Sequence, residues 1–167
     1  MREKWNKKYS NMQKIPIANT ILKRFLHLVN NRNRALDIAC GLGHNAYYLA
    51  QQGFVVDAID ISEVALQKAI KHPKIHYIHA DLTRFSIEPE SYDLIINFNY
   101  LQRDLFPAII KGLKSDGVVL FEAFTYHSDM NPHYCLYKNE LLEAFFPLEI
   151  YYYRLKEGKA ILVAIKN

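Results

Sequence analysis

The chain has 167 residues, half of them hydrophobic, and a formal net charge of +4. This length suits one domain with a core of useful size and excludes two. No apolar run approaches the ~20 residues that cross a bilayer, and two cysteines make neither a disulfide framework nor a metal pattern. We therefore expect a cytoplasmic protein without a metal or membrane contact, as a monomer or homodimer, and a solvated basic surface rather than nucleic-acid binding.

Residues 1–34 are expected to form an N-terminal helical cap on a Rossmann-like core of residues 35–167. Residues 1–14 are polar and basic, but Trp5 and Tyr9 are spaced i, i+4 and would share one face of a helix. Residues 17–29 carry an apolar stripe typical of an amphipathic helix. A polar loop then leads to residue 35.

Residues 35–46 predict a strand, a tight turn and the start of a helix. Gly41 and Gly43 lack a Cβ where the backbone turns and where a ligand could lie against it. The following helix offers unpaired N–H groups to ligand oxygens. Taken alone, Gly-x-Gly-x-x-Ala fits a dinucleotide-binding fold or merely a tight strand–helix turn.

Asp37 narrows these alternatives. A carboxylate near the end of a buried strand needs a hydrogen-bonding or cationic partner. Asp37 precedes Gly41 by four residues, where a bound cation or amino group could be that partner, whereas a pyrophosphate would be repelled. The pattern favours a positively charged ligand over a nicotinamide dinucleotide.

A second carboxylate, Asp60, follows the strand predicted at 54–59, after a helix at about 44–52 that ends before Gly53. A carboxylate at the end of a second strand is well placed to bind both ribose hydroxyls. Its alternative role is to supply negative charge at the start of the next helix, residues 63–71, with Ser62 as the N-cap.

The remaining elements complete an α/β pattern. We predict strands at 75–79, 92–98 and 118–124, helices at 105–114 and 139–146, and an antiparallel hairpin of strands 148–155 and 159–165. The expected fold is therefore a single-domain, Rossmann-like, doubly wound seven-stranded sheet, mostly parallel with an antiparallel C-terminal strand. Ligands bind such sheets at the switch point between the first and fourth strands.

The stretch Leu36 to Gly43 resembles the first motif of class I S-adenosylmethionine-dependent methyltransferases. With residues 45–50 and 60–62 added, the chain is most similar to their small tellurite-resistance/thiopurine-type branch. The resemblance implies S-adenosyl-L-methionine as cofactor, with the carboxylate after the third strand bonding the adenine amine. The implied cofactor-binding residues are Asp37, Ala39, Cys40, Gly41, Gly43, Asn45, Asp60, Ile61, Ala80, Asp81, Leu82, Asn97 and Phe98.

The acceptor side is expected to use aromatic residues from residues 1–14 and from the loop at 125–137, which lie over the switch point as a lid. The alternative is that these rings complete the core. Candidates for the acceptor site or lid are Trp5, Tyr9, Tyr100, Arg103, Tyr126, His127 and Tyr134. His127, His133 and Tyr100 are also the candidates for a general base, but a thiolate or oxyanion acceptor would need none.

We thus expect in-line methyl transfer to a small-molecule acceptor. Two alternatives stay open: a nicotinamide-dependent oxidoreductase and a non-catalytic protein that binds S-adenosyl ligands. The segment between the fifth strand and the last helix is shorter than in the tellurite-resistance pattern, and the N-terminal extension is small. Tellurite is therefore not carried over as the acceptor.

Overall fold

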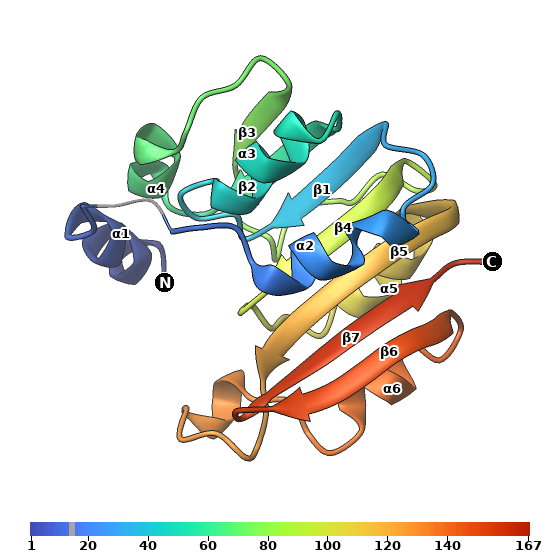
Figure 1. Cartoon of the computed structure of the whole chain (residues 1–167). Helices are drawn as coiled ribbons and strands as arrows, with labels where there is room; N and C mark the ends of the chain where they lie inside the picture. Colours follow the sequence, from blue (N-terminus) through green and yellow to red (C-terminus); the bar gives the residue numbers. More distant parts are fainter. Residues whose placement is uncertain (14–15) are drawn as a thin grey trace.

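A computed structural model describes residues 1–13 and 16–167, and seven strands in it form one sheet in the order β3-β2-β1-β4-β5-β7-β6 (Figure 1). Strands β1 to β5 pair in parallel, and β7 lies antiparallel between β5 and β6. The predicted sheet is confirmed. The strands are β1 Arg34–Ile38, β2 Val55–Asp60, β3 Ile75–His79, β4 Tyr92–Phe98, β5 Leu113–Phe124, β6 Glu149–Lys156 and β7 Lys159–Ile165.

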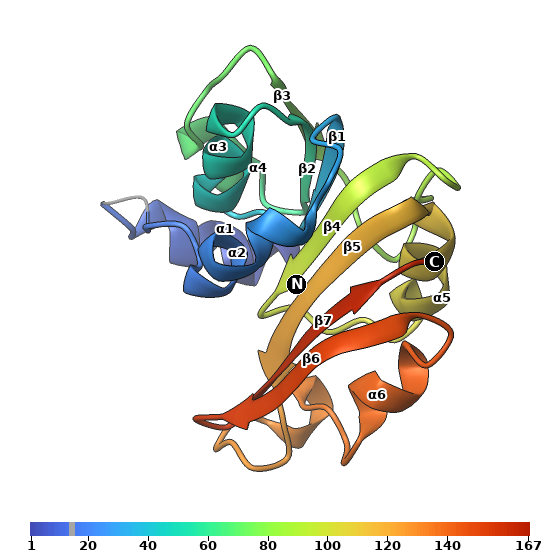
Figure 2. The same ribbon diagram turned by 45° about the vertical axis from the view of Figure 1, so that its right-hand side comes forward.

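Helices cover both faces of this sheet, and Figure 2 shows α5 and α6 on the face opposite to α2. One core packs Leu22, Leu49 and Leu66 of α2, α3 and α4 on the sheet, and the other packs Ile109 of α5 and Phe145 after α6. No helix in the described part of the chain has the length and apolarity to span a membrane. The α-helices are α1 Arg2–Ser10, α2 Thr20–Phe25, α3 His44–Gln51, α4 Glu63–Lys68, α5 Leu105–Gly112 and α6 Glu140–Ala144.

The N-terminal segment differs from the prediction at one helix start. The helix predicted from residue 17 begins at Thr20, because the Asn19 side chain accepts a hydrogen bond from Ile21 N at 2.8 Å and caps the first turn. Ile17 is 81% exposed, and the last turn, Leu26–Leu28, is a 3₁₀ helix. The predicted helical segment at 1–14 contains α1, while residue 14 lies outside the described residues.

Strand β5 begins five residues earlier than predicted. Helix α5 ends at Gly112, where a Cβ would lie 2.5 Å from Ile87 Cγ2, and the chain pairs at once through Leu113 with Tyr92 of β4. The pairing then shifts register before Leu94 meets Val118. The residues between these two pairings therefore form an irregularity inside the strand.

The C-terminal hairpin matches its prediction. Glu157 and Gly158 both have positive φ, at 52° and 76°, between the paired residues Lys156 and Lys159. Two central residues with positive φ are typical of a type I′ turn, whose twist suits a two-residue hairpin. The hairpin brings Lys159 to the edge where β5 ends, since Phe124 pairs with Lys159.

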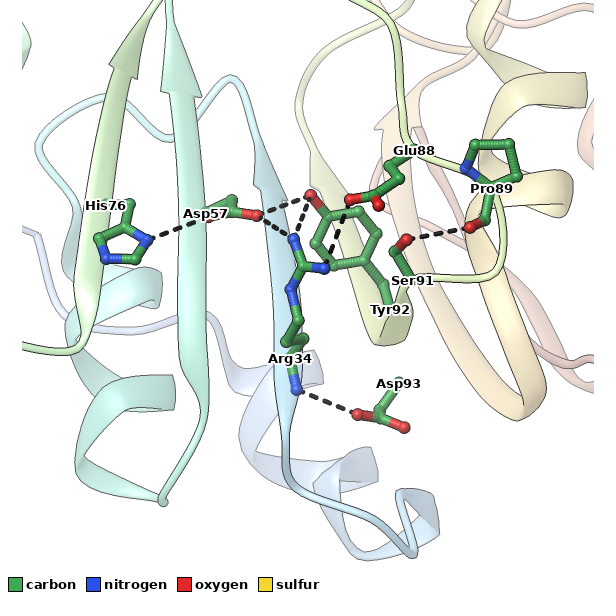
Figure 3. Close-up of polar contacts among 8 residues, drawn as sticks. All are labelled: Arg34, Asp57, His76, Glu88, Pro89, Ser91, Tyr92 and Asp93. Carbon is green, nitrogen blue, oxygen red and sulfur yellow. Dashed lines mark hydrogen bonds and ion pairs between the residues drawn. The ribbon is translucent and has the colours of Figure 1, made fainter.

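A polar network joins the amino-terminal parts of the central strands, away from their carboxyl ends (Figure 3). Arg34 pairs with Asp57 at 2.9 Å, and the Tyr92 hydroxyl donates to the same Asp57 oxygen at 2.7 Å. His76 Nδ1 lies 3.5 Å from the other Asp57 oxygen, and Arg34 N donates to Asp93 at 3.0 Å. These contacts connect β1, β2, β3 and β4 and contribute to the stability of the sheet.

Candidate functional site

A cavity of about 900 Å³ lies at the carboxyl ends of the parallel strands, beneath α1 and beside the loop that follows β5. Strand β1 lies beside β4, and the chain continues from these two strands in opposite directions along the sheet, from β1 to β2 and from β4 to β5. A crevice opens between the two connections at this switch point. Figure 1 shows α1 on the side to which the arrowheads of β1 and β4 point. Ten of the predicted cofactor-binding residues line the cavity: Asp37, Ala39, Cys40, Gly41, Asn45, Asp60, Ile61, Asp81, Leu82 and Phe98.

The two glycines of the turn have different physical reasons to be glycine. Gly41 lines the cavity with φ +57°, and a Cβ there would lie 2.6 Å from the Tyr9 hydroxyl oxygen. Gly43 does not line the cavity. Its φ is +78° and a Cβ there would collide with the Tyr77 hydroxyl, which donates to Ile70 O at 2.6 Å. Gly43 therefore serves packing on β3 in this structure.

Asp37 is a buried carboxylate at the wall of the cavity. It is 2% exposed, and its Oδ2 has no hydrogen-bond partner among the described residues. Burial, and then the nearby charge of Asp60, raises the pKa of Asp37 well above the usual aspartate value, against a hydrogen bond from the Ala46 backbone. A buried carboxylate oxygen facing a cavity favours a ligand that brings a donor and a positive charge.

Asp60 has a structural role together with its place in the cavity. Its two oxygens accept hydrogen bonds from Gly41 N and Ser62 N, both at 2.8 Å. Burial raises the pKa of Asp60, and the hydrogen bonds from Ser62, Gly41 and Ile61 oppose this shift. Asp60 thus holds the Gly41 loop against the start of α4, where Ser62 caps the helix as predicted through Ala65 N at 3.1 Å.

Asp81 is exposed at the end of β3, and its contacts are local. Its Oδ1 accepts hydrogen bonds from Thr83 N at 2.9 Å and Thr83 Oγ1 at 2.7 Å, and these hydrogen bonds lower the pKa of the carboxyl. The adjacent Leu82 is buried at the cavity wall. A charged acceptor beside an apolar wall suits a flat ring with an amino group.

Two further predicted residues, Ala80 and Asn97, do not line the cavity, whereas Asn45 lines it and also supports a neighbouring helix. Ala80 donates its N–H to Asp60 O at 3.1 Å and does not line the cavity. Asn97 is 1% exposed and donates to Tyr100 O at 2.7 Å, so it shapes the loop after β4. Asn45 lines the cavity and accepts Asn19 N at 2.8 Å, which fixes the start of α2.

The backbone is unusual at both strand ends of the switch point. Ala39 after β1 has φ 57° and Asn99 after β4 has φ 59°. Left-handed backbone costs a residue with a Cβ about 1 kcal/mol or more, and asparagine tolerates it better than alanine. Both residues line the cavity, so the strained conformation of Ala39 coincides with the candidate site.

Helix α1 covers the cavity with one face. Positions 4, 5, 8 and 9 of α1 line the cavity together with Met1 before the helix and Met12 after it, which is the spacing of a single helical stripe. The opposite side is attached to α4: Ser62 Oγ donates to Asn6 Oδ1 at 2.5 Å, and Lys68 Nζ donates to Tyr9 O at 2.7 Å. No residue of Arg2–Ser10 is buried, so α1 lies over the site without forming part of the core.

The predicted acceptor and lid residues fall into two groups. Trp5, Tyr9, Tyr100 and Tyr134 line the cavity, and burial followed by the Asp81 charge raises the pKa of Tyr100 to about 12. The others face elsewhere. Arg103 pairs with Glu140 at 2.6 Å and donates to Cys135 O at 3.0 Å, which makes it a structural residue between α5 and α6.

The Tyr126 and His127 rings lie tilted against each other, with centroids 4.0 Å apart, and neither residue lines the cavity. His133, a base candidate, also lies outside its wall. Within residues 1–13 and 16–167, no group of three or more His, Cys, Asp or Glu side chains is arranged to hold a metal ion.

Several cavity residues were missed by sequence reasoning. His44 and Gln102 line the cavity, and burial lowers the pKa of His44. Three lysines also line it. Lys4 and Lys8 could have been found, because they share the stripe of Trp5 and Tyr9, whereas Lys159 reaches the cavity only because β7 inserts between β5 and β6.

Comparison with known proteins adds a family and a fold. Residues 35–117 match a family model described as a methyltransferase domain. The chain is 30% identical to YqeM of Bacillus subtilis over 104 residues, covering 54% of this chain and 42% of that protein. It is also 30% identical to the ubiquinone biosynthesis O-methyltransferase of Pasteurella multocida over 108 residues, 53% of this chain and 45% of the relative. The chain thus spans less than half the length of these curated relatives.

The solved structures agree on the fold. The crystal structure of TehB from Haemophilus influenzae superposes with a TM-score of 0.74 at 20% identity, covering 99% of this chain and 67% of that chain. At this identity the likeness concerns the fold alone. It extends beyond the matched residues 35–117 and includes the inserted antiparallel strand β7.

Proposed function

By its fold and by the methyltransferase-domain sequence of residues 35–117, the chain belongs to the class I S-adenosylmethionine-dependent methyltransferases, and we propose that it transfers a methyl group to a small-molecule acceptor. The cofactor of this family is S-adenosyl-L-methionine. The acceptor is proposed to be small because the cavity, of about 900 Å³, lies between α1 and the loop after β5. A relative named for ubiquinone biosynthesis supports this acceptor class.

The observation that carries the proposal is the unpartnered, buried oxygen of Asp37 at the cavity wall. The ammonium group of S-adenosylmethionine would supply both the missing donor and the missing counter-charge. A dinucleotide would bring phosphates toward Asp37 and Asp60, whose like charges already oppose each other. The charge of the site therefore favours S-adenosylmethionine over a nicotinamide cofactor.

The other residues fit the remaining parts of the cofactor. Gly41 allows close approach at the turn, and Asp60 offers its carboxylate at the end of β2 where ribose hydroxyls would bind. Asp81 offers an exposed acceptor to the adenine amine, with Leu82 at the ring.

The chain's own contribution to catalysis is positional. When bound, S-adenosylmethionine would supply an electrophilic sulfonium methyl group for transfer to the acceptor, with S-adenosylhomocysteine as the leaving group. The cavity residues hold the two reactants in line, and α1 with Tyr134 excludes water. We assign no general base: burial lowers the pKa of His44, but nothing in its contacts directs it at an acceptor.

The proposal is tested by turnover. Purified protein should convert S-adenosylmethionine to S-adenosylhomocysteine when a panel of thiols, phenols and oxyanions is supplied, with the product detected by mass spectrometry. Asp37→Asn should abolish most of this conversion. A protein that binds S-adenosylmethionine but methylates no member of a broad panel would instead support the non-catalytic alternative.

A further inference from the structure

We propose that the acceptor is an anion, held through a carboxylate or phosphate group by Lys4, Lys8 and Lys159. This inference rests on the proposed methyl transfer, because it names the substrate class of the same cavity. It arises from the division of charge within the cavity. The carboxylates Asp37 and Asp60 come from β1 and β2, whereas the lysines come from α1 and β7.

The two α1 lysines face the cavity in place of apolar residues. Lys4 and Lys8 occupy the same helical stripe as Trp5 and Tyr9, while Lys7 is exposed and does not line the cavity. A helix that covered a core would carry apolar side chains on this stripe. The placement of two ammonium groups here favours an anionic partner inside the cavity.

Each of the three lysines lies over an aromatic ring. Lys4 Nζ lies 5.4 Å from the Tyr134 ring centroid, Lys8 Nζ 4.9 Å from that of Trp5, and Lys159 Nζ 4.7 Å from that of Phe124. Within the residues that the structure describes, none of the three forms an ion pair within 4.0 Å. Their charge is therefore available to a ligand.

The lysines also come from two sides of the cavity. Lys4 reaches from α1 to Tyr134 in the loop after β5, and Lys159 begins β7 beside the end of β5. An anion between them would contact α1 and the sheet together, so acceptor binding would hold α1 over the site. Water still reaches these ammonium groups, since Lys4 and Lys8 are exposed, and the attraction should weaken with salt.

The chain offers a direct probe of this end of the cavity. Trp5 is the one tryptophan in the sequence and lies beneath Lys8. Its fluorescence can be followed during titration with benzoate, phenyl phosphate and benzamide, which share a ring and differ in charge. The protein is first saturated with S-adenosylhomocysteine, whose binding is measured separately by calorimetry.

We expect benzoate or phenyl phosphate to bind about tenfold more tightly than benzamide. Whichever anion binds better identifies the recognised group as carboxylate or phosphate. Lys4→Gln, Lys8→Gln and Lys159→Gln should each weaken anion binding about threefold or more and leave S-adenosylhomocysteine affinity unchanged. Lys7→Gln, which removes the same charge from the outer face of α1, should change anion affinity less than about twofold.

Equal binding of benzoate, phenyl phosphate and benzamide would overturn the inference. So would a loss in Lys7→Gln as large as that in Lys8→Gln, because the effect would then follow net charge rather than the cavity. If S-adenosylhomocysteine fails to bind, the proposed function fails, and the anion titration is read on the free protein. Failure of the proposed function and failure of the anion inference can therefore be distinguished.

Discussion

Asp37 connects the chemistry of the site with its stability. Its carboxyl is buried beside Asp60, and its folded pKa is raised. Since the unfolded chain loses this proton at a lower pH, the free protein should lose stability as pH rises from the usual aspartate range toward the raised pKa. Below that range both states are protonated and the penalty is absent. The carboxylate is thus a cost to the free protein that a cationic ligand offsets.

Asp37→Asn should therefore separate stability from binding. The variant should unfold at an equal or higher temperature than the wild type at neutral pH, yet bind S-adenosylmethionine roughly tenfold to a hundredfold more weakly, as expected for a charge-assisted contact of ~1.5–3 kcal/mol. Wild-type affinity should increase with pH as Asp37 ionises, and the variant should show no such increase. Thermal melts and calorimetry at several pH values measure both. A variant with wild-type affinity would contradict the assignment.

Asp81 differs from Asp37 because it is exposed and bonds only to its neighbour Thr83. Asp81→Asn keeps the shape but can present a donor where the adenine amine requires an acceptor. S-adenosylhomocysteine affinity should fall about tenfold, while the melting temperature of the free protein stays nearly unchanged. A large loss of melting temperature would mean that Asp81 is structural.

At the level of elements, α1 depends on a small attachment. Lys68 Nζ of α4 donates to Tyr9 O, Ser10 O and Met12 O at 2.7, 3.0 and 3.3 Å, which satisfies carbonyls at the end of α1. Since α1 buries no residue, its position over the cavity relies on such contacts.

Lys68→Met should release α1 and weaken S-adenosylmethionine binding a few-fold, with little change in melting temperature because α1 contributes no core. The steady-state anisotropy of Trp5 fluorescence should fall as α1 gains freedom. Lys74→Met removes an exposed lysine whose side chain makes no hydrogen bond or ion pair in the described structure, and it serves as the control. Unchanged affinity and anisotropy in Lys68→Met would show that α1 does not depend on this attachment.

The element pattern could be predicted from the sequence where local signals and tertiary structure agree. Strands β3, β4 and β7 have the predicted bounds, because apolar runs between polar turns are unambiguous there. The helix start at Asn19 was missed because the apolar stripe extends back to Ile17, which proves exposed. The early start of β5 was missed because Leu113 joins the sheet only through its pairing with Tyr92, a contact between distant residues.

The residues of the candidate site also divide into those that could be predicted from the sequence and those that could not. Residues in the Gly41 turn and at strand ends follow from topology, so Asp37, Asp60 and Asp81 were found together. Long side chains that come from other elements were not placed correctly, because the direction in which they point depends on packing. Arg103 pairs with Glu140 instead of lining the cavity, whereas Lys159 lines it through strand insertion.

On the scale of the whole molecule, stability and ligand binding are located at opposite ends of the sheet. The network of Arg34, Asp57 and Tyr92 lies toward the amino ends of the strands (Figure 3), and the cavity lies at their carboxyl ends. Tyr92→Phe removes one hydrogen bond to Asp57 and should lower the free energy of unfolding by ~1 kcal/mol. S-adenosylmethionine affinity should not change. Denaturant unfolding and calorimetry on the same variant would reveal any coupling between the two ends.

The most direct test of the account is calorimetric titration of the wild-type protein with S-adenosylmethionine and, in parallel, with NADH. The acidic cavity wall formed by Asp37, Asp60 and Asp81 predicts one site for S-adenosylmethionine and no measurable binding of NADH. Binding of NADH with no binding of S-adenosylmethionine would contradict the account.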